Sequence, residues 1–262
     1  MKKEMTPEQL ARADDNYFYS YRVLMENMKK GSVDLDVRYT DSGTNFIVMN
    51  VVILTEPFGF EEDRVRKCLD HFRQVGRTVR FVFRAPVETV LDAIPSLRSC
   101  EKRVAAPLMV HSDLRSLTPS DDLDWRAVES EKTLSDYNSV MMSAYGVYGW
   151  PEFMIPKALT LGCAQRPDVI MIVGYVDGDP ATGAMAVIEG DLAGVYWVGT
   201  KPEYGRRGLA TKVTNQVAYL GSEMGCTWSV LQASVQGAPV YQRMGYAIEG
   251  IYEGLTYDPK GE

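Results

Sequence analysis

The sequence of 262 residues contains only two histidines, His71 and His111, and both lie in its first half. The second half therefore has no histidine that could act there as a general base or bind a metal ion. The four cysteines, at positions 68, 100, 163 and 226, are widely spaced and form no CxxC pair. This spacing is typical of reduced thiols in a cytosolic protein, and it indicates neither a disulfide framework nor a zinc site.

Long apolar runs and an excess of positive charge are also lacking. The longest apolar stretches, Phe46 to Leu54 and Val169 to Val176, are too short to cross a bilayer. The net charge of −7 provides no general basic surface for nucleic acid. The first residues turn acidic and polar without an apolar signal core. We therefore expect a soluble, cytoplasmic protein that binds neither nucleic acid nor a membrane.

Two halves of the chain share one predicted order of elements. Each has a strand, a helix ended by glycine (Gly76 or Gly225), a second strand, a short helix and a third strand. The polar segment Ser116 to Asp122 contains a proline and is the candidate linker between them. We predict an α/β fold with two tandem domains, residues 1–117 and 118–262. Residue identity between the halves is poor, so the hypothesis of a duplicated fold rests on the pattern alone.

One segment of the second half carries a chemical signal. A strand predicted to end at Thr200 is followed by the turn Lys-Pro-Glu-Tyr-Gly-Arg-Arg-Gly, residues 201–208, and then at once by a long helix. The first amides of a helix lack backbone partners and the macrodipole is positive there, so the turn suits a phosphate. A glycine turn with solvated arginines is the alternative. The segment matches neither a P-loop, because no lysine follows Gly208, nor a G-x-G-x-x-G dinucleotide loop.

This turn resembles the pyrophosphate loop of the GCN5-related N-acetyltransferase (GNAT) superfamily, whose pattern is [Q/R]-x-x-G-x-[G/A]. Residues 208–210, Gly-Leu-Ala, fill its last three positions. Gly205 stands where glutamine or arginine is usual, which removes one side-chain contact. The later segment Leu231 to Tyr246 resembles the next block of the family, with Tyr241 before a Gly-aromatic pair. The resemblance covers roughly Trp125 to Tyr257.

The resemblance implies GNAT-like domains with mixed, mostly antiparallel sheets flanked by helices. It also implies that acyl-CoA, usually acetyl-CoA, binds with its pantetheine between two splayed strands, without a metal. The residues implied to bind it are Val198, Thr200, Gly205, Arg206, Arg207, Gly208, Leu209, Ala210, Thr211 and Ser234. The first half instead places Glu61, Glu62 and Asp63 at the matching helix start, where they would repel a diphosphate. We expect no cofactor there.

The resemblance also assigns a role to Tyr241, which would donate a proton or a hydrogen bond to the departing thiolate. A phenol with a pKa near 10 can hydrogen-bond a thiolate whose conjugate acid has a pKa near 8.5 without ionising. A tyrosine of the core is the alternative. Glu189 is the first candidate for a general base, with Asp191 and Glu152 behind it. Each could equally be a solvated turn residue, in which case ordered water would serve.

Four aromatic residues are predicted to line the acceptor pocket, unless they belong to the core: Tyr148, Trp150, Phe153 and Trp197. The predicted function is transfer of an acetyl or other short acyl group from coenzyme A to an amine by direct attack in a ternary complex. The acceptor is a small-molecule or peptide amine, and the protein a monomer or homodimer. The alternative is a non-catalytic acyl-CoA-binding or regulatory module, which the departure at Gly205 favours.

Overall fold

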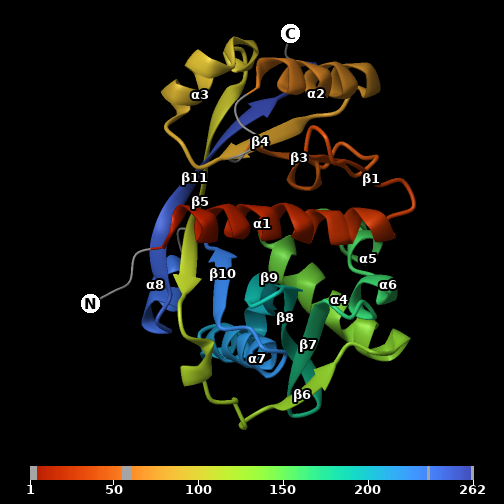
Figure 1. The fold of residues 1–262 in the computed structure, drawn as a ribbon. Helices are drawn as coiled ribbons and strands as arrows, with labels where there is room; N and C mark the ends of the chain where they lie inside the picture. Colours follow the sequence, from red (N-terminus) through yellow and green to blue (C-terminus); the bar gives the residue numbers. More distant parts are fainter. Residues whose placement is uncertain (1–4, 55–60, 235–236, 261–262) are drawn as a thin grey trace. The chain divides into compact units, whose positions relative to one another are not determined.

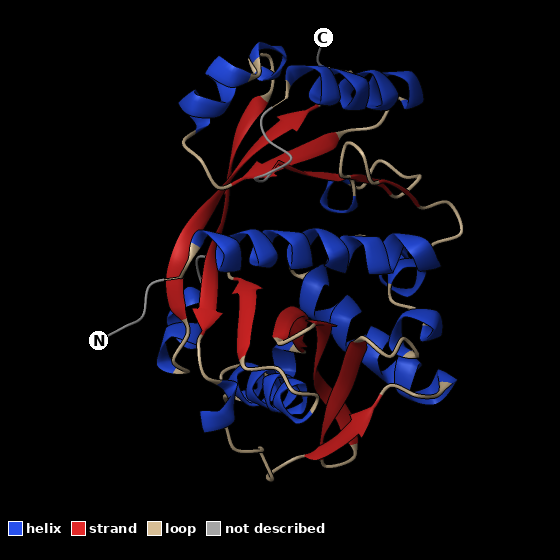
Figure 2. Cartoon of the chain, viewed as in Figure 1, coloured by secondary structure: helices blue, strands red, loops and turns tan. Residues whose placement is uncertain are grey.

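The computed structural model describes residues 5–54, 61–234 and 237–260. They fall into two compact units, and in each unit helices cover both faces of the strands (Figures 1 and 2). Unit 1 comprises residues 1–108 and 248–262, and unit 2 comprises residues 109–247. No helix within the described ranges combines the length and the apolar character needed to span a membrane. The fold is α/β with mostly antiparallel sheets, as predicted.

Unit 1 contains a mixed sheet in the order β1-β2-β3-β4-β11-β5. Its elements are α1 (Pro7–Asn27), β1 (Ser32–Asp34), β2 (Tyr39–Asp41), β3 (Val51–Leu54), α2 (Glu62–Val75), β4 (Val79–Phe83), α3 (Val87–Ala93), β5 (Glu101–His111) and β11 (Ala247–Tyr257). Helix α2 connects the parallel strands β3 and β4, because a parallel pair needs such a crossover. Strand β11 pairs with β4 in the antiparallel direction.

The core of unit 1 follows from the alternation of side chains along β3. Val51 and Ile53 pack against Phe18 of α1 on one face. Val52 and Leu54 belong to the cluster on the other face, which α2 and α3 cover. A strand buried on both faces reads as a continuous apolar run, and this explains why the run Phe46 to Leu54 contains β3.

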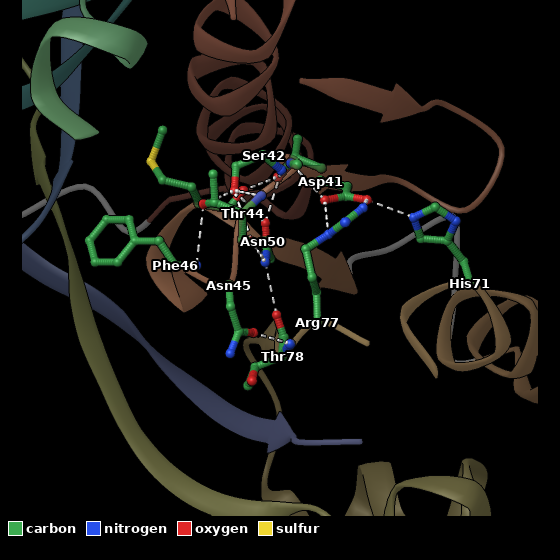
Figure 3. Close-up of polar contacts among 12 residues, drawn as sticks. Asp41, Ser42, Thr44, Asn45, Phe46, Asn50, His71, Arg77 and Thr78 are labelled. Carbon is green, nitrogen blue, oxygen red and sulfur yellow. Dashed lines mark hydrogen bonds and ion pairs between the residues drawn. The ribbon is translucent and has the colours of Figure 1, made fainter. Parts of the chain in front are cut away.

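A buried polar network fixes the end of β2 in unit 1 (Figure 3). The carboxylate of Asp41, whose side chain is 2% exposed, accepts hydrogen bonds from the Arg77 guanidinium, from Gly43 N at 2.9 Å and from His71 Nε2 at 2.8 Å. Burial alone would raise the pKa of Asp41, but the hydrogen bonds from Arg77 and His71 outweigh it and lower the pKa. Asn50 links Ser42 N to Thr78 O in the same network.

Unit 2 contains the sheet order β5-β10-β9-β8-β7-β6, to which β5 contributes its last residues. Its other elements are β6 (Asp124–Ala127), α4 (Glu131–Gly146), α5 (Ile155–Ala158), α6 (Leu161–Ala164), β7 (Val169–Val176), β8 (Asp179–Glu189), β9 (Leu192–Thr200), α7 (Leu209–Glu223), β10 (Trp228–Gln232) and α8 (Ala238–Arg243). Strands β6 to β9 are antiparallel neighbours, and α7 joins the parallel pair β9 and β10.

The two units differ from the predicted domains 1–117 and 118–262 at both ends. Residues 109–117 belong to unit 2, and the last strand belongs largely to unit 1 because β11 pairs with β4 there. The predicted linker, Ser116 to Asp122, instead lies along α7. Asn215 Nδ2 donates to Thr118 O at 2.7 Å, and Ser120 N donates to Gln216 Oε1 at 2.9 Å. The polar composition indicated a linker, but these polar groups bond to a helix.

Candidate functional site

Strands β9 and β10 separate soon after they begin. Their parallel register runs from the pair Trp228 and Leu192 to the pair Val230 and Gly194. Beyond it, β9 continues to Thr200 beside β8 alone, and β10 continues to Gln232. We call the diverging segments, residues 195–200 and 231–232, the fork. Strand edges inside a fork carry main-chain groups available to a ligand.

The register of β9 shows which main-chain groups face the fork. Thr182 is opposite Thr200, and Lys201 N donates to Ala181 O at 2.9 Å. In an antiparallel ladder bonded pairs alternate with unbonded ones, so the main chain of Thr200 turns away from β8. Val198 lies two residues before Thr200, in the same segment of the fork. These two residues are the ones predicted to contact the pantetheine.

A β-bulge interrupts β9 inside the fork. The register shifts between Gly183 and Met185, so Ala184 stands opposite both Trp197 and Val198. Trp197 has φ +50°, which is rare for a bulky residue and costs on the order of 1–3 kcal/mol. The surrounding structure must therefore hold the bulge in place.

The turn that follows β9 exposes unpaired amides. Arg206 has φ +60° and Gly208 has φ +76°, and α7 begins at Leu209. No side chain caps this helix, and the first bond within it runs from Lys212 N to Gly208 O. Within the described chain, the amides of residues 209–211 therefore meet no acceptor. A Cβ at Gly208 would meet no atom within 4 Å, so an anion could approach.

Gly205 is required by the shape of the turn. A Cβ at this position would lie 2.9 Å from the carbonyl oxygen of Pro202, so a longer side chain would clash with the backbone. This explains why the usual glutamine or arginine is absent. A cavity of about 500 Å³ adjoins the turn, with Arg207 and Lys212 among its lining residues and Asp122 and Asp177 among its carboxylates. Lys212 forms an ion pair with Asp122.

Ser234 and Tyr241 approach each other where β10 leads into α8. A Cβ on Gly237 would lie 3.1 Å from Ser234 Oγ and 3.2 Å from Tyr241 Cε2. Ser234 Oγ accepts a hydrogen bond from Gly237 N at 3.0 Å. Burial raises the pKa of Tyr241, and the Thr214 hydroxyl of α7 offsets part of that rise. The phenol therefore stays protonated at neutral pH and can act as a donor.

The comparison with known protein families decides what this arrangement is. The model of the acetyltransferase (GNAT) family matches residues 127–246, from the last residue of β6 to the residues that follow α8. Residues 127–246 are a GNAT acetyltransferase domain. The fork and the amide turn both lie within it. A comparison with curated proteins finds no match to this chain.

Solved structures share the fold of the chain well beyond the GNAT domain. A GCN5-related N-acetyltransferase from Kribbella flavida has a TM-score of 0.64 at 18% identity, and the match covers 94% of each chain. A conserved protein of unknown function from Staphylococcus epidermidis ATCC 12228 has a TM-score of 0.59 at 20% identity, covering 82% of this chain and 86% of that one. A GCN5-related N-acetyltransferase from Sphaerobacter thermophilus has a TM-score of 0.55 at 14% identity, covering 74% and 65%. At these identities the likeness shows the fold.

The carboxylates proposed as bases lie in two regions of the GNAT domain. Glu189 ends β8 and pairs with Leu192, at the closed end of the fork. Val195, where the fork begins, is three residues beyond Leu192 along β9, which is about 10 Å at the rise per residue of a β-strand. The carboxylate of Asp191 accepts a hydrogen bond from Thr227 Oγ1 at 3.1 Å, also at the closed end. Glu152 is exposed in a short turn after α4.

Two of the four predicted acceptor aromatics come together at the bulge. The rings of Trp150 and Trp197 lie 5.5 Å apart, and Tyr145 lies 4.7 Å from Trp150 and 5.4 Å from Trp197. We call these residues the three-ring cluster. Tyr148 and Phe153 are outside it and are 66% and 57% exposed. They are therefore placed in neither the cluster nor the core.

Three residues near the fork make contacts that the sequence did not reveal. The hydroxyls of Tyr137 and Tyr145, both on α4, reach carbonyl groups of β9. Helical spacing shows a shared face but not what a hydroxyl at its edge contacts. His111 belongs to unit 2 because β5 ends there, and its ring packs 5.3 Å from that of Tyr246. Burial lowers the pKa of His111.

Proposed function

We propose that the GNAT domain transfers an acetyl or another short acyl group from coenzyme A to an amine, by direct attack in a ternary complex. The observation that carries the proposal is the run of unpaired amides at residues 209–211, which follows the turn after a strand whose inner edge is open. A helix start of this kind binds phosphate. An open strand edge suits an extended chain with amide groups, which is what pantetheine is. Membership of the acetyltransferase family supports the same assignment.

In this proposal the cofactor spans the fork and the turn. The main-chain groups of Val198 and Thr200 bind the pantetheine. The pyrophosphate is bound by the amides and cations of the turn and the first helical residues, namely Gly205, Arg206, Arg207, Gly208, Leu209, Ala210 and Thr211. Because no side chain is available at position 205, the two arginines supply the positive charge that complements the phosphates.

The leaving thiol is proposed to lie near Ser234 and Tyr241. The neutral amine attacks the thioester carbonyl carbon, and the C–S bond then breaks. Tyr241 donates a hydrogen bond or a proton to the departing sulfur, for which its raised pKa keeps the hydroxyl protonated. An amine with the pKa of lysine is only about 0.04% neutral at pH 7, so its proton must be removed. We assign that step to water rather than to Glu189, which lies at the closed end of the fork.

The three-ring cluster sits at the bulge and is proposed as the wall of the acceptor pocket. Its indole and phenol faces suit the apolar part of a small-molecule or peptide amine. Tyr148 and Phe153, exposed in the neighbouring loop, are proposed to contact the part of the acceptor that extends outward.

The test is release of free thiol from acetyl-CoA in the presence of a panel of amines, together with calorimetry of coenzyme A binding. We expect binding and thiol release that depends on the amine. Binding without release for any amine would instead indicate a non-catalytic acyl-CoA-binding module, the alternative that the departure at Gly205 favours. Absence of binding would refute both.

A further inference from the structure

The bulge of β9 is held from α4 by two phenols. Tyr137 Oη donates to the carbonyl of Trp197 at 3.2 Å, and Tyr145 Oη donates to the carbonyl of Val198 at 3.3 Å. We propose that Tyr137 and Tyr145 are positioning residues that hold the bulge in the conformation in which its main chain meets the acyl thioester. This inference rests on the proposed function and concerns how the same site is kept in order.

Glycines allow α4 to lie close enough for these contacts. A Cβ on Gly183 would lie 3.0 Å from both Met141 Cε and Tyr137 Cδ2. A Cβ on Gly199 would lie 3.0 Å from Met141 Sδ and 3.1 Å from Ala144 Cβ. Larger residues in β8 or β9 would push the helix away from the strands. The contact brings the phenols on either side of Met141 within reach of two consecutive carbonyls.

The bulge needs these donors. Two consecutive carbonyls of the bulge accept hydrogen bonds from these phenols, and a buried carbonyl that meets no donor is unfavourable. Trp197 is also held at a positive φ, which the backbone would leave if it were free. The Tyr137 ring is fully buried, while Tyr145 is half-buried and packs on Trp150 and Trp197. Both hydroxyls therefore reach the strand from fixed rings.

The consequence concerns the carbonyl of the thioester. The bulge lies in the fork, where the proposed function places the thioester, so a main-chain N–H of the bulge can donate to the oxygen that gains negative charge during attack. The direction of that N–H depends on the peptide planes of the bulge. Loss of a phenol would let those planes rotate without removing any group that contacts the cofactor phosphates. A variant that lacks one of these hydroxyls should therefore have a lower kcat and an unchanged affinity for the cofactor.

The experiment compares Tyr145→Phe with Tyr175→Phe. Tyr175 is a matched control, because its hydroxyl also joins α4 to a strand, donating to Asp136 at 2.7 Å, but that strand is β7. We expect Tyr145→Phe to lower kcat about tenfold or more while the Kd for coenzyme A changes less than about twofold. The carbonyl ¹³C signal of bound [1-¹³C]acetyl-CoA, recorded without acceptor, should move toward its position in free acetyl-CoA. The control should show neither change.

A wild-type carbonyl signal and wild-type kcat in Tyr145→Phe would overturn the inference and leave the proposed function intact. Failure of the wild-type protein to bind acetyl-CoA would refute the proposed function itself, and with it this inference. Tyr137→Phe provides a second variant should Tyr145→Phe not fold, as judged by thermal denaturation. Its expected signature is the same, because its hydroxyl holds the adjacent carbonyl.

Discussion

At the scale of single residues, the mechanism depends most on the Tyr241 hydroxyl. Tyr241→Phe removes it with little loss of volume, so the fold and the affinity for acetyl-CoA should be preserved. If the hydroxyl assists the departing thiolate, its loss acts on the transition state and lowers kcat more than it raises KM. General acid assistance contributes about 10²–10⁴-fold, so we expect at least a tenfold decrease, measured as thiol release. Wild-type turnover would show that Tyr241 is structural and would direct attention to Ser234.

Asp41 in unit 1 allows a residue-scale prediction about stability. Arg77→Ala would leave a carboxylate that is 2% exposed without its main partner. Removing one member of a buried pair costs about 3–5 kcal/mol, so the free energy of unfolding in urea at pH 7 should fall by about that amount. Arg98→Ala is the control, because the Arg98–Asp92 pair is exposed and should contribute less than about 1 kcal/mol.

The difference in unfolding free energy between the wild type and Arg77→Ala should depend on pH, and the direction of that dependence follows from Asp41. The pKa of Asp41 is lowered in the folded state, so its contribution to stability is present above the ordinary value of 3.8 and disappears as the pH falls through the lower, folded value. The gap between wild type and Arg77→Ala should therefore narrow below about pH 4. A gap that is constant from pH 7 to pH 3 would contradict this account.

At the scale of elements, the start of α7 is the feature most open to test. Gly208→Glu would place a carboxylate where the pyrophosphate is proposed to bind. A unit charge about 4 Å from a phosphate costs about 4 kcal/mol at an effective dielectric of 20. We therefore expect the Kd for coenzyme A, measured by calorimetry, to rise at least a hundredfold, which is about 2.8 kcal/mol.

Two controls separate charge from backbone strain in that experiment. Gly225 follows the same helix with φ +96°, and a Cβ added there would meet no atom within 4 Å. Gly225→Glu therefore adds similar backbone strain and the same charge, but at the C-terminal end of α7. It should leave the Kd nearly unchanged. Gly208→Ala adds the strain without the charge and should weaken binding far less than Gly208→Glu. Equal effects of the two Gly208 variants would mean that strain, not charge, is responsible.

Local patterns predicted the elements better than the contacts between them. The Gly-Leu-Ala run at 208–210 and the apolar face of α7 can be predicted from neighbouring residues, since helix starts and faces depend on short spacings. The bulge at Trp197 could not be predicted, because it depends on β8 and on hydroxyls more than 50 residues away. In the sequence, Gly205 could be seen only as a departure from the family pattern. The structure shows the reason, because a side chain at this position would clash with the carbonyl oxygen of Pro202.

At the scale of the whole molecule, the two units repeat one arrangement and differ in the acidic residues at one helix start. In each, a helix joins two parallel strands: α2 joins β3 and β4, and α7 joins β9 and β10. The order of elements along the chain allowed this repeat to be predicted. The order of elements could not show that β11 completes the sheet of unit 1. The pairing of β11 with β4 joins strands far apart in the sequence, and local spacing does not determine it.

The first turns of α2 and α7 lead to the last prediction. The first turn of α2 carries Glu62 and Asp63, whereas that of α7 carries no acid. Negative charge at a helix start satisfies the macrodipole internally and repels a diphosphate. We therefore expect coenzyme A to slow amide hydrogen exchange at residues 195–211 and to leave residues 62–65 of α2 unchanged. Protection of α2 instead, or of both helices equally, would mean that unit 1 binds the cofactor despite its acidic helix start.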